Sequence, residues 1–214
     1  MTIFKTADGS NSLTNAQGVA YHSKNGAVTE AMHIYINLCF NKLIKQEVKI
    51  LDVGFGTGLN AILTAIEAEK NQKKTLYVGI EKYPVDINIA KQMDYTSKIG
   101  NEELFEVIHQ STWGKVCEIN NYFSLLKIQG DITQTIPKGK FDGVYYDAFA
   151  PDDQPEIWTK EIFSNIKSEM SNNSILVTYC SKGIVKQALR DSGFEVKRFP
   201  GPPGKRHVVV AMVN

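Results

Sequence analysis

Four acidic residues of this chain stand at or near the ends of apolar, strand-like runs. They are Asp52 after VKIL, Glu81 after TLYVGI, Asp131 after YFSLLKIQG and Asp147 after FDGVYY. In an open α/β sheet, ligands bind outside the carboxyl ends of the strands, so side chains at those ends share one site. Carboxylates there accept hydrogen bonds from hydroxyls and amines, and they can also move protons. One such acid could be a helix cap or a loop residue, but acids at successive strand ends predict a functional site.

A glycine-rich turn follows the first of these acids. The segment VKILDVGFGTGLNAIL, residues 48–63, predicts a strand, a tight turn with Gly54, Gly56 and Gly58, and a helix. In nucleotide-binding sheets such glycines let the backbone approach a ligand, and the helix N-terminus favours negative charge. Leu59 stands where the dinucleotide fingerprint G-x-G-x-x-G requires its third glycine. This departure argues against NAD and favours S-adenosylmethionine.

The positions of the acids suggest their roles toward that cofactor. Glu81 can accept two hydrogen bonds from a ribose diol, and Asp131 can accept one from the adenine exocyclic amine. We expect Asp52 to hold the glycine loop or to face the ammonium group of the ligand. Asn60 and Lys82 complete the predicted cofactor contacts. A site rich in carboxylates stabilises the cationic sulfonium of S-adenosylmethionine, whereas the same carboxylates would repel the pyrophosphate of NAD.

Asp147, in the segment YYDAFAP, is predicted to lie where the methyl acceptor arrives. Methyl transfer is an in-line displacement, so the enzyme mainly aligns the nucleophile, the methyl group and the sulfur. A carboxylate beside an acceptor amine can orient its lone pair and stabilise the growing positive charge. The same carboxylate also favours the protonated form of the amine, which cannot react. The alternative is that Asp147 only caps a turn before Pro151.

The composition sets limits on partners and ligands. The 214 residues suit one α/β domain, and 24 basic against 23 acidic residues give no net attraction to nucleic acid. Residues 182–214 carry seven basic and two acidic residues, a solvated basic face unless the substrate is RNA. The three cysteines and four histidines lack the spacing of a disulfide framework or a metal site, so no metal is expected. With no signal peptide pattern and no membrane-spanning run, we expect a cytoplasmic protein.

The elements that must position these residues alternate between strands and helices. Strands are predicted at 48–52, 75–81, 122–131, 141–149, 174–180, 194–199 and 206–213. The alternation predicts a parallel sheet, and a Pro/Gly turn between the last two strands predicts a closing antiparallel hairpin. The fold class is therefore α/β, with a mostly parallel seven-stranded, Rossmann-like sheet of the kind associated with class I S-adenosylmethionine-dependent methyltransferases.

Helices and domain limits follow from the same pattern. Helices are predicted at about 28–43, after the glycine turn, after the Tyr-Pro pair at 83–84, after Pro155, and from Gly183 to a C-cap at Gly193. The first twenty-odd residues predict an irregular lead-in or a short hairpin, and residues 100–121 give no clear prediction. We expect a single methyltransferase domain over 1–214, with a lead-in and helix at 1–46 and the core at 47–214.

The chain resembles the methyltransferase domain of the MnmC family, the tRNA 5-methylaminomethyl-2-thiouridine biosynthesis proteins. The resemblance rests on YHSKNGAVTEAMHIYI, ILDVGFGTGLNAIL, VGIEKYP, DAFAPDDQPEIWTKEIF, TYCSKGIVKQALRDSGFEV and PGPPGKRHVVVA. It implies methylation of the aminomethyl group on a wobble uridine in the tRNA anticodon loop. It also implies that Asp147, Phe149 and Pro151 lie at the acceptor amine, and that Glu30 and residues 21–26 fold over the cofactor.

An RNA substrate gives further residues an expected role. A wobble base is already unstacked, so aromatic residues near Asp147 could stack on it. Tyr145 and Tyr146 lie on opposite strand faces, so at most one of them can face the site, and we expect it to be Tyr146. Trp158 lies on the apolar face of its helix and is expected in the core. Lys182, Lys205 and Arg206 are then expected to contact phosphates.

The MnmC proteins also carry an FAD-dependent oxidoreductase domain, which this sequence does not encode. The resemblance therefore implies a stand-alone methyltransferase without FAD, with a separate enzyme supplying the aminomethyl precursor. Two alternatives stay open: an aminopropyltransferase of the spermidine synthase type, and a non-catalytic RNA-binding module with the same fold. About 47 residues without clear strand alternation precede the first core strand, which counts against the former. The intact strand-end acids count against the latter.

Overall fold

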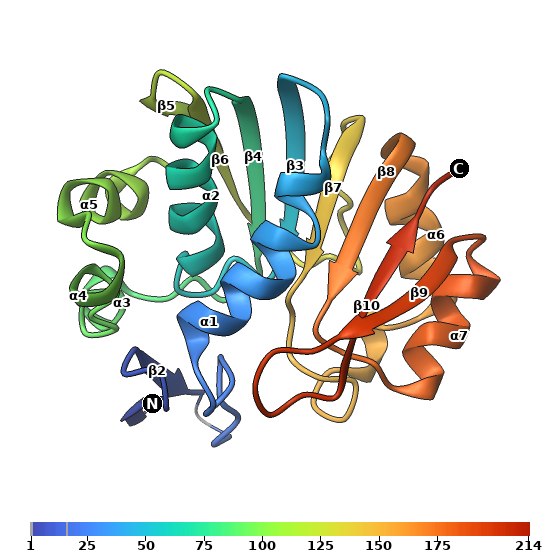
Figure 1. The fold of residues 1–214 in the computed structure, drawn as a ribbon, viewed down its shortest axis with the longest axis horizontal. Helices are drawn as coiled ribbons and strands as arrows, with labels where there is room; N and C mark the ends of the chain where they lie inside the picture. Colours follow the sequence, from blue (N-terminus) through green and yellow to red (C-terminus); the bar gives the residue numbers. More distant parts are fainter. Residues whose placement is uncertain (1, 16) are drawn as a thin grey trace.

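A single large sheet organises the protein in the computed structural model, which describes residues 2–15 and 17–214 (Figure 1). The order of its strands is β5-β6-β4-β3-β7-β8-β10-β9. Their bounds are β3 Glu47–Val53, β4 Lys74–Glu81, β5 Val116–Asn120, β6 Phe123–Gln129, β7 Phe141–Tyr146, β8 Met170–Thr178, β9 Glu195–Pro200 and β10 His207–Met212. The strands β6, β4, β3, β7 and β8 are parallel, and β10 pairs antiparallel with both β8 and β9. The predicted parallel sheet with a closing antiparallel hairpin is confirmed.

The sheet has eight strands, so the prediction of seven was wrong. The additional strand is β5, which pairs antiparallel with β6 at the edge of the sheet. It lies within residues 100–121, for which no clear prediction was possible, together with α5 (Glu102–Gln110). The strand has only five residues, VCEIN, and none of them is fully buried; the Val116 side chain is half exposed. An edge strand of this kind lacks the apolar alternation that reveals a buried strand.

Helices cover both faces of the sheet and enclose two apolar cores. One core lies among α1 (Ala27–Ala31), α2 (Leu59–Lys70), α5 and one sheet face, and the other among α6 (Lys160–Ser168), α7 (Gly183–Asp191) and the opposite face. Successive residues of a central strand therefore enter different cores, as Tyr145 and Tyr146 do. Strands that are buried on both faces have continuous apolar sequences, which is why these strands could be predicted from the sequence.

Some element boundaries differ from the prediction. The predicted helix at 28–43 is α1, then a π-helical segment at Met32–Asn37 and a 3₁₀ turn at Phe40–Lys42. Pro155 opens a 3₁₀ turn, Pro155–Ile157, and α6 begins only after Thr159, whose side chain accepts from the Ile162 N–H. The Tyr-Pro pair at 83–84 precedes the short helices α3 (Ile87–Lys91) and α4 (Thr96–Ile99). The strands β6 and β7 end before the predicted limits, so Asp131 and Asp147 lie just beyond them.

The N-terminal segment forms a hairpin that docks on α1. Its strands are β1 (Thr2–Lys5) and β2 (Asn11–Thr14), which confirms the hairpin option for the lead-in. Asp8, in the turn, accepts a hydrogen bond from the Thr29 N–H at 2.9 Å and so satisfies a free donor at the start of α1. Hydrogen bonds from this N–H and from Ser10 and Thr6 overcome the effect of burial and lower the pKa of Asp8. The hairpin thereby fixes the N-terminal end of α1.

The closing hairpin reaches back to the same region. The loop at 201–206 lies beside the beginning of α1 (Figure 1). His33 makes a 2.9 Å hydrogen bond to the Pro200 carbonyl oxygen, and Gly204, with φ +85°, lies against the Asn25 side chain. Gly193 closes α7 with φ +82°, which confirms its predicted capping role. The N-terminal region and the loop at 201–206 therefore meet near the carboxyl ends of the parallel strands.

Candidate active site

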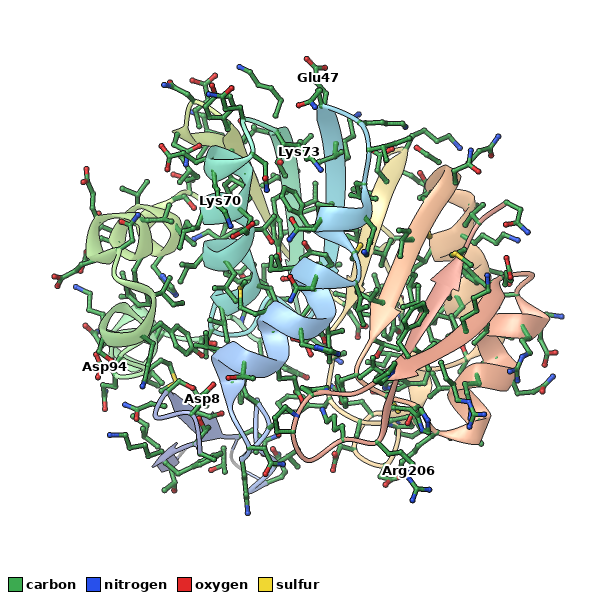
Figure 2. All side chains as sticks on the ribbon, in the orientation of Figure 1. Asp8, Glu47, Lys70, Lys73, Asp94 and Arg206 are labelled. Atoms are coloured by element: carbon green, nitrogen blue, oxygen red, sulfur yellow. The ribbon has the colours of Figure 1, made fainter. Side chains whose placement is uncertain are left out.

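A cavity of about 320 Å³ lies at the carboxyl ends of β3, β4, β6, β7 and β8. Figure 2 labels Glu47, at the start of β3, at one end of the molecule, and Asp8 and Arg206 at the end where the cavity opens. The predicted residues that line it are Glu30, Gly54, Gly56, Glu81, Lys82, Asp131, Asp147, Phe149 and Lys205. The topology thus brings together residues separated by up to 175 positions in the chain, as expected for strand-end acids.

The glycine loop leaves room where side chains would intrude. A Cβ at Gly54 would lie 2.7 Å from the Asp147 carbonyl oxygen, and the φ of +95° is unfavourable for other residues. Gly56, with φ +52°, donates its N–H to Glu81 at 3.0 Å and lies near the Tyr21 ring. Gly58 does not line the cavity; it is the left-handed residue that begins α2. Two of the predicted glycines therefore face the cavity, and the third shapes the turn behind them.

At one end of the cavity, backbone amides and one lysine fix two carboxylates. Glu81 accepts from the N–H groups of Gly56 and Tyr83, at 3.0 and 2.8 Å. Burial raises the pKa of Glu81 above its usual value, against these hydrogen bonds. Asp131 pairs with Lys82 at 2.8 Å, and this interaction holds the pKa of Asp131 below its usual value. Both carboxylates are therefore oriented before a ligand binds, and each keeps unused acceptor capacity.

At the other end, Asp147 has a different environment. Burial raises the pKa of Asp147 to about 7, although the nearby Tyr35 hydroxyl and the Asn60 amide oppose the shift. The Asn60 side-chain amide donates to Asp147 Oδ2 at 2.8 Å. The nearby charge of Glu30 raises the pKa further, whereas that of Lys205 lowers it. Asp147 can therefore exchange a proton near neutral pH, as a general base must.

Two aromatic side chains hold the backbone of the loop that follows Asp147. The Tyr179 hydroxyl donates to the Ala148 carbonyl oxygen at 2.8 Å, and the Trp158 indole N–H donates to the Phe149 carbonyl oxygen at 2.8 Å. The Phe149 ring stacks edge-to-face on Tyr21, with 5.0 Å between centroids. The motif DAFAP with a following Trp thus has a physical basis, because the Trp fixes the loop that carries the acid. Trp158 is buried in the core, as predicted.

Asp52 and Asn60 lie behind the cavity and do not line it. Asp52 is fully buried, accepts from the Tyr77 hydroxyl at 2.6 Å, and has its pKa raised well above the usual range by burial. Asp52 was expected to hold the glycine loop or to face the ammonium group of the ligand; its side chain turns instead to Tyr77, on the α2 side of the sheet. Asn60 was predicted as a cofactor contact, but its amide is instead bonded to Asp147.

Two residues predicted at the acceptor do not line the cavity either. Tyr146 is fully buried, packs edge-to-face on Trp158 and donates its hydroxyl to the Ile157 carbonyl oxygen. Tyr145 is equally buried on the opposite face, so neither ring can stack on a base in this arrangement. Pro151 is also buried. The expectation for Tyr146 failed because β7 is a central strand covered on both faces, so its side chains fill the two cores.

The three predicted phosphate contacts have different environments. Arg206 is exposed, and Lys182 is exposed and paired with Asp152. Lys205, in contrast, turns into the cavity and pairs with Glu30 at 2.6 Å. Of the three, only Arg206 and Lys182 lie on the outside of the molecule.

Sequence reasoning missed several aromatic residues of the site. Tyr35 lies beside Asp147, and Tyr179 lines the cavity. His22, from the segment 21–26 that was expected to fold over the cofactor, also lines it, and burial lowers the pKa of this histidine to about 4. Tyr35 belongs to the N-terminal region, where no strand-end rule applies. Tyr179 directly follows β8, so its position at a strand end was the one signal that could have identified it.

The described part of the chain contains neither a metal-binding cluster nor a membrane-spanning helix. In residues 2–15 and 17–214, no group of three or more His, Cys, Asp or Glu side chains is arranged to hold a metal ion. None of the helices there has both the length and the apolar composition needed to cross a bilayer.

Comparison with known proteins identifies the class of enzyme. Residues 101–214 match the family described as S-adenosyl-L-methionine-dependent methyltransferase, and the chain belongs to this family. The chain is 30% identical over 210 residues to the tRNA 5-methylaminomethyl-2-thiouridine biosynthesis bifunctional protein MnmC of Leptospira interrogans, covering 89% of this chain and 32% of that protein. The MnmC of Pseudoalteromonas atlantica is 28% identical, over 97% of this chain and 32% of its own length. The chain thus spans about a third of these curated relatives.

Solved structures agree with the fold. The crystal structure of MnmC2 from Aquifex aeolicus has a TM-score of 0.81 and 26% identity, covering 99% of this chain and 70% of that chain. Spermidine synthase from Thermotoga maritima has a TM-score of 0.61 at 14% identity, over 98% and 67% of the two chains, a likeness of fold alone. The predicted class I methyltransferase fold is confirmed.

The cofactor of this family is S-adenosylmethionine, as the glycine spacing predicted. The residues present fit it. Gly54 and Gly56 leave the backbone open to a ligand, and Glu81 and Asp131 present carboxylates to the same cavity. Bound there, the cofactor supplies an electrophilic methyl group on a cationic sulfur, whose charge the surrounding carboxylates favour.

Proposed function

We propose that this chain methylates the amine of an aminomethyl group on a tRNA wobble uridine, giving a methylaminomethyl group. The observation that carries the proposal is Asp147, a buried carboxylate with a pKa of about 7 beside the glycine loop. The printed names of the MnmC relatives, which concern 5-methylaminomethyl-2-thiouridine biosynthesis in tRNA, support this choice of acceptor.

An alkylamine resembles a lysine side chain and arrives mostly as an ammonium ion at neutral pH. Asp147 first holds this ammonium and then accepts one of its protons, which frees the nitrogen lone pair. The nitrogen–carbon bond then forms as the carbon–sulfur bond breaks in line, and the nitrogen becomes positively charged. Asp147, oriented by Asn60, stabilises that charge once it has passed the proton to solvent.

The RNA has to bring a base to a cavity whose inner wall contains Phe149 and Tyr21. An anticodon-loop base is extruded at lower cost than a base in a duplex. Phe149 is the aromatic residue we assign to contact with the base, since Tyr146 is buried. Arg206 and Lys182 are the outer residues assigned to phosphates, and the cytoplasm, where tRNA is available, is the expected location.

The test is to incubate the protein with labelled S-adenosylmethionine and with tRNA that carries aminomethyluridine at the wobble position, and then to analyse the nucleosides. The expected result is labelled methylaminomethyluridine, with no product from tRNA whose wobble uridine is unmodified. Label in another nucleoside, or none at high enzyme concentration, would overturn the proposal. In a parallel assay with decarboxylated S-adenosylmethionine and a small polyamine, transfer of the aminopropyl group would favour the aminopropyltransferase alternative. Binding of tRNA without transfer would favour a binding module.

A further inference from the structure

Lys205 and Glu30 form an ion pair inside the cavity, with 2.6 Å between Lys205 Nζ and Glu30 Oε2. Their side chains are 25% and 11% exposed, so the pair is largely shielded from water. The Lys205 ammonium also lies 4.2 Å from the centroid of the Tyr179 ring. The two residues come from α1 and from the loop at 201–206, which lie side by side (Figure 1). The pair therefore forms a charged wall of the site that the proposed acceptor chemistry does not use.

The charges of the pair indicate what kind of group it can bind. Because Glu30 neutralises Lys205, the pair attracts a phosphate poorly, since a phosphate contact needs uncompensated positive charge. Both groups nevertheless keep unused hydrogen-bonding capacity. An ammonium has three donors, of which Glu30 uses one, and a carboxylate has acceptor sites beyond the one that Lys205 occupies. A ligand group that carries one positive and one negative charge matches such a pair.

The position of the pair within the cavity points to the same ligand. The charges of Glu30 and Lys205 both act on Asp147, whereas Lys82 holds Asp131 at the ends of β4 and β6. The pair therefore lies at the Asp147 end, away from the acids assigned to adenosine. The cofactor of this family carries an α-amino acid group, a zwitterion, at the end of the molecule opposite its adenine.

We propose that Lys205 and Glu30 bind the amino acid group of the cofactor, with Lys205 donating to its α-carboxylate and Glu30 accepting from its α-ammonium. This assignment rests on the cofactor class and is independent of the proposed tRNA substrate. It gives the loop at 201–206 a role in selecting a cofactor that retains its carboxylate, since a decarboxylated analogue leaves Lys205 without its ligand partner.

The test compares two ligands that share the thioadenosine group. S-adenosylhomocysteine has the amino acid group, and 5′-deoxy-5′-methylthioadenosine lacks it. By isothermal titration calorimetry, Lys205→Met should raise the Kd for S-adenosylhomocysteine roughly 10- to 100-fold, the range expected for one lost charge-assisted hydrogen bond. The Kd for methylthioadenosine should change less than about twofold, because that ligand makes no contact with the pair. Glu30→Gln should show the same selectivity with a smaller loss.

Matched variants distinguish this role from its alternatives. Lys205→Arg keeps the charge and should recover most of the affinity for S-adenosylhomocysteine. Arg206→Met, in the same loop but exposed, should leave the affinity for both ligands unchanged. Equal losses for both ligands in Lys205→Met would assign the pair a structural role. An unchanged affinity for S-adenosylhomocysteine, together with weaker tRNA binding, would mean that Lys205 contacts the RNA. Either result overturns the assignment.

Discussion

Asp131 and Asp147 both follow a parallel strand and both line the cavity, yet their environments are opposite. Asp131 is paired with Lys82 and accepts two hydrogen bonds from Thr133, so its pKa lies below the usual value. Asp147 is buried beside Asn60 and Tyr35, and its pKa rises to about 7. One carboxylate is a fixed negative charge, whereas the other is poised to exchange a proton.

The difference separates binding from chemistry within one cavity. A carboxylate that stays ionised can accept a hydrogen bond at any physiological pH, which suits recognition of the adenosine part of the cofactor. A carboxylate with a pKa near 7 has the basicity needed to take a proton from an ammonium group. The two roles come from neighbouring side chains and burial, because both residues are aspartates at equivalent places in the sheet.

The largest expected effect comes from Asp147→Asn. The amide cannot accept a proton, so kcat should fall by about 10²- to 10⁴-fold, the usual contribution of a general base. The Kd for S-adenosylhomocysteine should stay within about twofold, since the shape of the side chain is kept. Single-turnover kinetics and calorimetry measure the two quantities. A large loss of cofactor affinity would show that Asp147 binds the cofactor and would remove the contrast with Asp131.

Asp131→Asn should give the reverse result. Loss of the charge weakens the predicted hydrogen bond to the adenine amine and leaves Lys82 unpaired, so the cofactor Kd should rise roughly 3- to 10-fold. At saturating cofactor, kcat should remain close to that of the wild type. A matched control is Asp152→Asn, since Asp152 is also paired with a lysine but lies outside the cavity lining. If kcat falls while the Kd is unchanged, adenosine recognition is misassigned.

A smaller effect is expected when the surroundings of Asp147 are changed. Asn60→Leu removes the amide that stabilises the ionised carboxylate, so the pKa of Asp147 should rise by about 1, equivalent to ~1.4 kcal/mol. The acidic limb of the pH profile of kcat/KM should move to higher pH by that amount. Thr64→Val, one turn along α2, removes a hydroxyl that donates to the Asn60 carbonyl oxygen and contacts the Tyr145 hydroxyl, but makes no bond to Asp147. It should leave the profile in place; a shift of equal size in both variants would mean a general disturbance of α2.

These contrasts also mark what the sequence could predict. Apolar runs ending in acids located the parallel strands, and their common direction brought Glu81, Asp131 and Asp147 into one cavity. The strand-end rule does not say which way a side chain turns, so Asp52 was placed at the ligand although it faces the core. Lys205 was expected to contact phosphate, and its pairing with Glu30 was not foreseen, because the pair links positions 175 residues apart, which local sequence patterns cannot reveal.

The last expected effect is on stability, and it depends on pH. The pKa of Asp147 is about 7 in the folded protein and near 3.8 when the chain is unfolded, so the folded state binds the proton more tightly. Stability from this group is present below about pH 4 and is lost as the pH rises through about 7. Asp147→Asn lacks this loss, so its Tm should exceed that of the wild type at pH 8. A pKa difference of about 3 corresponds to at most about 4 kcal/mol, and each kcal/mol shifts Tm by roughly 2–4 °C at this size. The difference should vanish near pH 4, and differential scanning calorimetry at both pH values measures it.

For Asp131→Asn the sign is opposite, because the pKa of Asp131 is lowered by folding, and its Tm should fall below that of the wild type at pH 8. A shift of the same sign in both variants would mean that the two carboxylates do not differ as their surroundings imply.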